Sequence, residues 1–279
     1  MLKIQKTIVN KAGERLIFDD IIPEEYGYMT VLNEKKGVLD KDGKQIIEAT
    51  YDNIRWCEEY KYFVVKKNKL YKILDAEGKQ IGNCEFEWVG ICTEGMIEIG
   101  NNAQKGFISV DGKYFIEPEY DEVETFFKGK VKVYKAKKCG YVKKDGFQII
   151  PVEYEFISSF YEGVAIMRKN GRYGYISEDG IELLAPEYEE ISEFEYGFGF
   201  AQKGNQLVCV TRSGKKVFRL DGQTIFIEMN ESIERLSDYY GVKGNCIYFK
   251  ENGLVLIETE ENWICFFKLL ELLNLRKLK

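Results

Sequence analysis

The sequence predicts an all-β repeat protein, and three observations lead to that fold class. A glycine returns at intervals of 34 residues, a short run of aromatic and β-branched residues precedes it, and an aromatic residue follows it at a fixed distance. The recurring glycines are Gly43, Gly78, Gly112, Gly146, Gly180 and Gly214, with only Gly43 one residue out of step. A period of about 20–50 residues is typical of arrays in which each unit buries its apolar face against its neighbours.

Each repeat begins with a strand that ends at a turn. Residues 105–112 read Lys-Gly-Phe-Ile-Ser-Val-Asp-Gly, and residues 139–146 and 173–180 repeat this pattern with the closing Asp-Gly retained. Asp-Gly favours a two-residue hairpin turn, because glycine adopts positive φ freely and aspartate tolerates it. We therefore expect a tight β-hairpin at each recurring glycine.

A second apolar run follows each turn, and an aromatic residue stands eight residues after the glycine. These aromatic residues are Tyr51, Phe86, Tyr120, Tyr154 and Tyr188, and each is followed by Asp or Glu. A further glycine then opens another apolar run, at Gly95, Gly129, Gly163 and Gly197. Each repeat therefore offers three strands, and the segment after the aromatic residue, such as 120–126, is a candidate for a fourth.

Three to four strands per repeat predict about six to seven hairpin or meander units, with the recurring glycine and aromatic residue in structural roles. Such units suit a β-propeller, in which each unit is one blade and closure hides the strand edges. An open, curved β-solenoid is the alternative geometry. The array is expected over residues 1–218, with a worn first unit at 1–35.

A small α+β piece is expected over residues 219–279. Asn230 or Ser232 could cap a short helix that Gly241 ends. Asn252-Gly253 predicts a hairpin between the apolar runs at 246–249 and 254–257.

From Thr259 the pattern is that of a terminal amphipathic helix. Its apolar face carries Trp263, Phe266, Leu270 and Leu273. This helix is interpreted either as a lid that docks on the end of the array or as the element that binds a partner protein.

The repeat resembles the WG-repeat (KWG) family of bacterial proteins. Residues 160–165 read Phe-Tyr-Glu-Gly-Val-Ala and residues 170–176 read Asn-Gly-Arg-Tyr-Gly-Tyr-Ile, which is the best match within the chain. The tryptophan of the family name is absent, and its positions are held by Lys36, Tyr71, Lys105, Cys139, Tyr173 and Leu207. Lys72 and Val208 replace the glycine that follows it. The resemblance covers about residues 35–215 and implies a β-repeat architecture with no common reaction.

The composition excludes several kinds of site. The chain has no histidine, which excludes Ser-His-Asp and Cys-His catalysis and histidine-containing zinc sites. Its seven cysteines form no CxxC pair, and they are interpreted as reduced thiols of a cytoplasmic protein. No phosphate-binding glycine motif is present. We therefore expect no catalytic residue, no cofactor and no metal.

The net charge of −6 makes a nucleic-acid partner unexpected, and no apolar run is long enough for a membrane span. Acidic–aromatic clusters, such as Glu153-Tyr154-Glu155, could hold a cation, bind a sugar or work as an acid–base pair. The other interpretation is a buried tyrosine between solvated acids. The sequence favours a non-enzymatic scaffold that binds another protein, with a carbohydrate or small-ligand binder as the alternative and a carboxylate-based hydrolase as a remote one.

Overall fold

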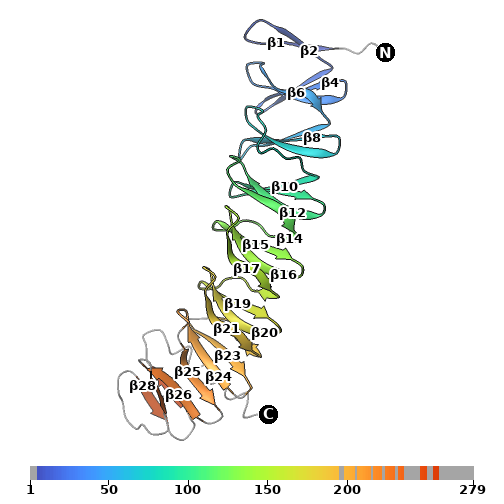
Figure 1. Cartoon of the computed structure of the whole chain (residues 1–279). Helices are drawn as coiled ribbons and strands as arrows, with labels where there is room; N and C mark the ends of the chain where they lie inside the picture. The colour runs from blue at the N-terminus through green and yellow to red at the C-terminus, as the bar shows by residue number, and fades with distance from the viewer. Residues whose placement is uncertain are drawn as a thin grey trace. The chain divides into compact units, whose positions relative to one another are not determined.

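The computed structural model describes residues 5–194, 198–204, 206–214, 216–221, 224–229, 232–235, 246–249 and 254–257. Every helix or strand within these ranges is a β-strand, which confirms the all-β repeat fold (Figure 1). In this part of the chain no helix is long and apolar enough to cross a membrane.

The chain divides into two compact units. Unit 1 contains residues 1–136 and 141–148, and unit 2 contains residues 137–140 and 149–279. In both units each sheet is an antiparallel meander, since its strands lie side by side in chain order.

The sheets of unit 1 follow the repeat. They are β1 (Lys6–Val9) with β2 (Arg15–Phe18); β3 (Asp20–Glu24), β4 (Gly27–Leu32), β5 (Lys35–Leu39) and β6 (Gln45–Tyr51); β7 (Asn53–Cys57), β8 (Tyr62–Lys67) and β9 (Leu70–Asp75); and β10 (Trp88–Thr93), β11 (Met96–Asn101), β12 (Gln104–Ser109) and β13 (Phe115–Tyr120). Strands β14 (Glu122–Val123) and β15 (Lys130–Lys135) also belong to unit 1, whereas β16 (Lys138–Lys143) and β17 (Gln148–Tyr154) have residues in both units.

Unit 2 continues with the same meander. Its sheets are β18 (Phe156–Ile157), β19 (Val164–Lys169), β20 (Arg172–Ser177) and β21 (Glu182–Tyr188); then β22 (Glu190–Ile191), β23 (Phe198–Lys203), β24 (Gln206–Thr211), β25 (Lys216–Asp221), β26 (Thr224–Met229) and β27 (Ser232–Arg235); and β28 (Cys246–Phe249) with β29 (Leu254–Ile257). A complete repeat thus begins at the acidic residue that follows one recurring aromatic residue. It ends at the next recurring aromatic residue in the chain.

The residues after 218 correct one expectation and confirm another. Ser232–Arg235 is strand β27, paired with β26, so the short helix expected from Asn230 or Ser232 is wrong at these residues. Pairing with a neighbouring strand outweighs the local capping signal. The hairpin at 246–257 is confirmed, because β28 pairs with β29. The helix with Trp263, Phe266, Leu270 and Leu273 lies outside the described residues.

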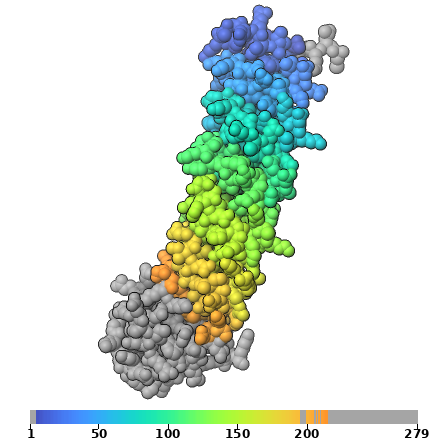
Figure 2. Space-filling view, viewed as in Figure 1, coloured from blue at the N-terminus to red at the C-terminus, as the bar shows by residue number. Residues whose placement is uncertain are grey.

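Successive sheets within a unit stack face to face. In unit 1, β5 and β6 lie against β7 and β8, and in unit 2, β20 and β21 lie against β22 and β23. The sheets of unit 1 leave no opening between them on the face seen in Figure 2. Sheets of this kind occur both in β-propellers and in open β-solenoids, the two geometries expected from the sequence.

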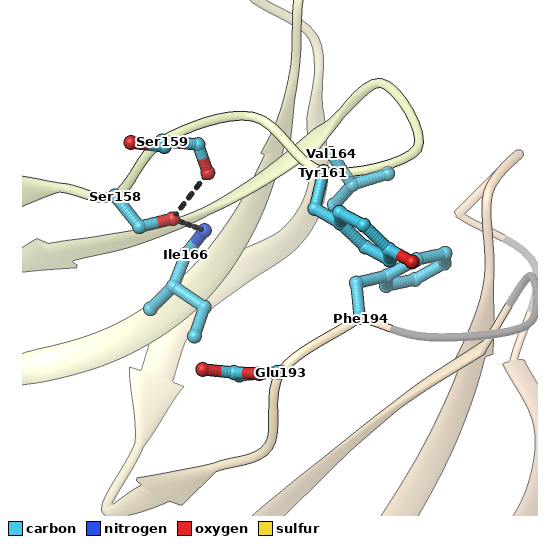
Figure 3. Close-up of a pocket in the computed structure, with 7 residues that line it drawn as sticks. All are labelled: Ser158, Ser159, Tyr161, Val164, Ile166, Glu193 and Phe194. Carbon is cyan, nitrogen blue, oxygen red and sulfur yellow. Dashed lines mark hydrogen bonds between the residues drawn. The ribbon is translucent and has the colours of Figure 1, made fainter.

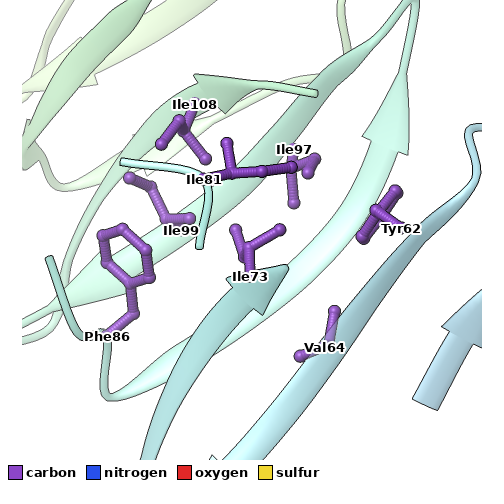
Figure 4. Close-up of a cluster of buried hydrophobic side chains, with 8 residues drawn as sticks. All are labelled: Tyr62, Val64, Ile73, Ile81, Phe86, Ile97, Ile99 and Ile108. Atoms are coloured by element: carbon purple, nitrogen blue, oxygen red, sulfur yellow. The ribbon is translucent and has the colours of Figure 1, made fainter. Parts of the chain in front are cut away.

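Strand β8 shows why a repeat needs both neighbours. Tyr62 and Val64 point to one side of the strand, where they pack with Ile73, Ile97 and Ile108 (Figure 4). The alternate residues Phe63 and Val65 join a second cluster with residues from β5, β6, β7 and β9. Because successive side chains of a strand point to opposite faces, a strand buried on both faces reads as a continuous apolar run.

The recurring glycine makes a different turn from the expected one. Gly112 has φ +69° and its N–H donates to the Ser109 carbonyl at 2.9 Å, while Asp111 keeps negative φ. The other recurring glycines of the series donate in the same way to the residue three positions earlier. The turn is therefore a type I turn followed by a glycine in the left-handed region, not a two-residue Asp-Gly turn.

A second glycine, at the start of the third strand, faces a bulge in the fourth. Lys105 pairs with Tyr120 and Phe107 with Ile116, so residues 117–119 bulge out opposite Gly106. A Cβ atom on Gly106 would lie 2.3 Å from the Ile116 oxygen. Only glycine leaves room for the backbone of the neighbouring strand there.

Two repeats lack this glycine and depart from the four-stranded meander. With Lys72 in its place, the sheet keeps three strands, and the fourth is reduced to the isolated bridges Leu74–Gln80 and Tyr71–Phe86. With Val208 in its place, β24 pairs with β25 without a bulge at that position, and the sheet extends to six strands.

Candidate binding surface

The acidic–aromatic clusters lie inside the array. Tyr120, Tyr154 and Tyr188 are only 2%, 3% and 7% exposed, and Phe86 is fully buried. Tyr154 donates a hydrogen bond of 3.0 Å to Glu182, and burial raises its pKa above the ordinary value of tyrosine, with a further contribution from this carboxylate. These rings offer no face to a ligand.

The recurring aromatic residue pairs with the position where the family has tryptophan. Tyr51 pairs with Lys36, Tyr120 with Lys105, and Tyr188 with Tyr173. The aromatic ring on one strand thus lies beside a side chain on the neighbouring strand that differs between repeats. The two strands therefore pair although the family's tryptophan is absent from that position.

The acid after each aromatic residue holds a hairpin turn of its own sheet. The carboxylate accepts a hydrogen bond from a backbone N–H in the turn between the second and third strands. The pairs are Asp52 with Asn68 at 2.9 Å, Glu87 with Asn102 at 2.8 Å, Asp121 with Ala136 at 2.7 Å, Glu155 with Gly171 at 3.2 Å and Glu189 with Gly204 at 3.2 Å. The N–H of Gly171 and then the Arg168 side chain hold the pKa of Glu155 below its ordinary value.

These turns explain why the acids recur. Asn68 and Lys69 have φ of 51° and 72°, and Asn102 and Ala103 have φ of 51° and 61°. Two successive residues with positive φ form the type I′ turn, and the carboxylate stabilises it by satisfying an exposed N–H. The recurring Asn at these positions is the sequence signal for them. Within the described residues no group of three or more acids or cysteines could hold a metal ion.

Cysteine offers no activated nucleophile in the part of unit 1 where two thiols meet. Cys57 and Cys92 both lie beside the buried Tyr62. Burial, followed by the charge of Cys57, raises the pKa of Cys92 to about 11. The thiol is therefore protonated at neutral pH and is not a thiolate nucleophile.

The opposite end of each sheet carries exposed apolar side chains. We call it the turn edge: the turns between strands one and two and between strands three and four, at residues 93–96, 109–114, 126–130 and 143–147 in unit 1 and 158–164 and 177–181 in unit 2. The two turns of one sheet touch, as the Val110 N–H donates to the Gly95 oxygen at 2.9 Å in unit 1 and the Glu178 N–H to the Gly163 oxygen at 3.1 Å in unit 2.

The exposed side chains on the turn edge follow the period of the repeat. Phe127 and Tyr161, 67% and 62% exposed, hold the same position in successive repeats, and so do Phe147 and Ile181, 63% and 62% exposed. Lys128 lies over the Phe127 ring at 5.4 Å, and Lys143 over the Phe147 ring at 5.7 Å. These exposed side chains make the turn edge a candidate contact surface. Their equal spacing in the sequence is the signal by which they could have been found.

Unit 2 also contains an open pocket of about 540 Å³ beside its turn edge. It is lined by Ser158, Ser159, Tyr161, Val164, Ile166, Glu193 and Phe194. Figure 3 shows the two serines and Glu193 on one side and the rings of Tyr161 and Phe194 on the other. Within the described residues it is a mixed site, lined by aliphatic, aromatic and polar side chains.

The structure leaves the predicted partner-binding residues untested. Trp263, Phe266, Leu270 and Leu273 lie outside the described residues, and the recurring glycines and aromatic residues lie in turns and at sheet ends. The turn-edge side chains and the pocket were not expected from the sequence.

Comparison with known proteins identifies the repeat. The model of the WG containing repeat matches residues 37–71, 106–139, 140–173 and 173–206. No curated protein matches the sequence.

Solved structures give only distant similarity. One is the AfRom2 CNH domain, with 11% identity, 79% of this chain and 94% of that chain covered, and a TM-score of 0.25. Another is PorZ of Porphyromonas gingivalis, with 10% identity, 83% and 40% covered, and a TM-score of 0.28. Hsv2 of Kluyveromyces lactis has 10% identity, 75% and 73% covered, and a TM-score of 0.25. The chain thus spans less than half the length of PorZ.

Proposed function

The chain belongs to the WG-repeat family, and from that premise we propose that it is a non-enzymatic scaffold that binds a partner protein through its turn edges. The observation that carries the proposal is the outward placement of Phe127, Phe147, Tyr161 and Ile181 at equivalent positions of successive repeats. Unit 1 carries Phe127 and Phe147 and unit 2 carries Tyr161 and Ile181, so each unit presents the same pair of turns to a partner. Such surfaces suit protein partners, which are bound by a few large apolar and aromatic anchors.

The rest of each repeat supports a scaffold. The acids hold turns and the recurring rings from Phe86 to Tyr188 are buried, so these repeated residues support the sheets and leave the turn edge as the exposed surface. The lysines over Phe127 and Phe147 add charged rims to apolar centres, which is the usual anatomy of an interface.

The experiment compares the full chain with a variant in which Phe127, Phe147, Tyr161 and Ile181 are all replaced by serine. Each protein is used to capture partners from an extract of its native cells, and the captured proteins are identified by mass spectrometry. We expect a partner held by the natural chain to be lost by the variant, since exposed anchors contribute to binding while their removal leaves the core intact.

The matched control is Leu70→Ser. Leu70 is also a large, exposed apolar side chain, 36% exposed, but it lies at the opposite end of its sheet from the turn edge. It should retain the partner, and the melting temperature of both variants checks that they remain folded. Retention of the partner by the four-residue variant, or capture of no partner by the natural chain, would contradict the proposal.

A chain ending at Glu258 tests the other candidate element. The predicted helix with Trp263, Phe266, Leu270 and Leu273 is absent from it. Loss of the partner from a folded truncated chain, with binding kept by the serine variant, would move the binding site to that helix.

A further inference from the structure

We propose that the pocket of unit 2 beside Tyr161 receives a basic side chain of the partner, arginine in preference to lysine. This inference rests on the proposed function and names the chemistry that the partner must present there. It is carried by the shape of the pocket, the polar groups of its walls that have no partner among the described residues, and the absence of a basic side chain among the described lining residues.

The floor of the pocket is apolar and one wall is an open aromatic face. Val164 and Phe194, each only 3% exposed, line the pocket together with Ile166, which lies on the side of Ser158 and Glu193 (Figure 3). Tyr161 by contrast is 62% exposed. A planar guanidinium can stack on such a ring while its alkyl chain covers the apolar floor.

Hydrogen-bond acceptors lie on both walls of the pocket. Among the described residues, the Glu193 carboxylate, the Ser159 hydroxyl and the Tyr161 hydroxyl have no hydrogen-bond or ion-pair partner. The nearby carboxylate of Glu162 is already paired with Arg212 at 2.6 Å. Among the lining residues that the structure describes, Glu193 thus supplies one free negative charge, which favours a cation and disfavours phosphate or carboxylate ligands.

Both walls are fixed by backbone hydrogen bonds before any ligand arrives. Tyr161 and Val164 exchange two backbone hydrogen bonds of 2.9 Å each. The Ser192 hydroxyl donates to the Glu193 carbonyl at 2.8 Å, and the buried Tyr175 hydroxyl donates to the Ser192 carbonyl at 2.8 Å. Preorganised walls lower the entropy lost on binding.

Unit 2 itself contains an arginine bound in the same way. The Arg168 guanidinium donates to Glu155 at 3.0 Å and lies over the Tyr173 ring at 5.9 Å. A carboxylate beside a tyrosine ring is therefore an arrangement that already holds an arginine on this framework. A guanidinium fits it better than an ammonium, because it can stack on the ring and donate two parallel hydrogen bonds to one carboxylate.

The test titrates the full chain with the peptide acetyl-Gly-Arg-Gly-amide and follows binding by NMR and calorimetry. The neutral peptide with citrulline in place of arginine keeps the shape of the side chain and removes its charge. We expect saturable binding of the arginine peptide at millimolar concentration, at least about fivefold weaker binding of the citrulline peptide, and weakening with added salt.

Three variants locate the site. Glu193→Gln should weaken binding of the arginine peptide at least about fivefold, and Tyr161→Leu about threefold or more. Glu190→Gln is the matched control, because Glu190 is an exposed glutamate three residues away on β22 and does not line the pocket. It removes the same charge and should leave the affinity unchanged within about 1.5-fold.

Equal binding of the two peptides, or equal effects of Glu193→Gln and Glu190→Gln, would overturn the inference. Binding of cellobiose that survives Glu193→Gln would assign the pocket to neutral polyhydroxy ligands instead. If the arginine peptide does not bind while the serine variant still loses its partner, the inference fails and the proposed scaffold function stands. If the peptide binds and no partner is captured, the scaffold function fails by itself.

Discussion

Two repeats of this chain show how one glycine decides the form of a sheet. In the repeat at 155–188, Gly174 lies opposite a bulge, and four strands pair from β18 to β21. In the repeat at 52–86, Lys72 holds that position and the fourth strand is reduced to isolated bridges. Both repeats keep the pairing at their ends, Tyr173 with Tyr188 and Tyr71 with Phe86.

The comparison shows that a repeat keeps its packing when the pairing at its ends and the burial of both sheet faces are retained, even where the fourth strand is lost. In the repeat with Lys72, the strand β8 is still buried on both faces by its neighbours. Packing between units therefore compensates for lost hydrogen bonds within one unit, as expected for arrays in which nearest-neighbour interfaces supply much of the stability.

The largest expected effect is at the buried ring of the regular repeat. Tyr175 is fully buried and its hydroxyl donates to the carbonyls of Ser192 and Phe200 at 2.8 and 3.1 Å. Tyr175→Ala should lower the free energy of unfolding by about 3–5 kcal/mol through cavity formation. Tyr175→Phe should cost only about 1–2 kcal/mol, because it removes the hydrogen bonds and keeps the packing. Urea denaturation measures both.

The repeat at 52–86, which has Lys72 in place of the glycine, provides the matched site for that prediction. Ile73 is the equivalent residue and is also fully buried. Ile73→Val should cost about 0.5–1.5 kcal/mol. A cost of Tyr175→Ala below that of Ile73→Val would contradict the view that the regular repeat depends on this ring.

The next effect tests the glycine itself. A Cβ atom on Gly174 would lie 2.3 Å from the Leu184 oxygen, so Gly174→Ala should cost about 2–3 kcal/mol by forcing the two strands apart. Lys72→Ala should change stability by less than about 0.5 kcal/mol, since no bulge faces that position. An equal loss of unfolding free energy for the two substitutions, measured by chemical denaturation, would show that the glycine does not decide the form of the sheet.

Hydrogen exchange sharpens the comparison without mutation. In the repeat at 52–86, the backbone N–H groups of residues 82–85 donate no backbone hydrogen bond among the described residues. In the repeat at 155–188, by contrast, Glu182–Tyr188 forms strand β21. The amides of 82–85 should exchange at least about tenfold faster than those of β21 that pair with β20. Similar protection in both segments would show that the fourth strand forms in solution despite Lys72.

The smallest effect concerns the carboxylates that hold the hairpin turns. The folded chain lowers the pKa of Glu155 from its ordinary value of 4.5, through the Gly171 N–H first, and lowers the pKa of Asp52 through Lys35 first and the Asn68 N–H second. A carboxylate with a lowered pKa adds stability above its ordinary pKa, and this is lost as the pH falls through the folded value. Glu155→Gln and Asp52→Asn should each reduce the fall in urea midpoint between pH 7 and pH 3.

Glu190→Gln is the control for these carboxylates. Glu190 is exposed and accepts no turn hydrogen bond within the described residues. It should leave the pH dependence unchanged. An equal effect of this variant would indicate that net charge, rather than the turn contact, sets the acid sensitivity.

The sequence by itself determined the repeat, its all-β nature and the positions of its turns. These follow from local chemistry: a glycine free to adopt positive φ, such as Gly112, and short alternating or continuous apolar runs. The same local reasoning gave the wrong turn type at Asp111-Gly112 and a helix at Ser232–Arg235, where the structure has a strand.

Only the tertiary structure decided what each repeated residue does. The acids after the aromatic residues could be ligands in the sequence, and the fold turns them onto backbone N–H groups such as that of Asn68. Phe127 and Tyr161 could be core residues in the sequence, and the fold places them outward on a turn. Period and composition determine which side chains recur, whereas burial and hydrogen-bond partners depend on how separate strands meet within one sheet or in two stacked sheets.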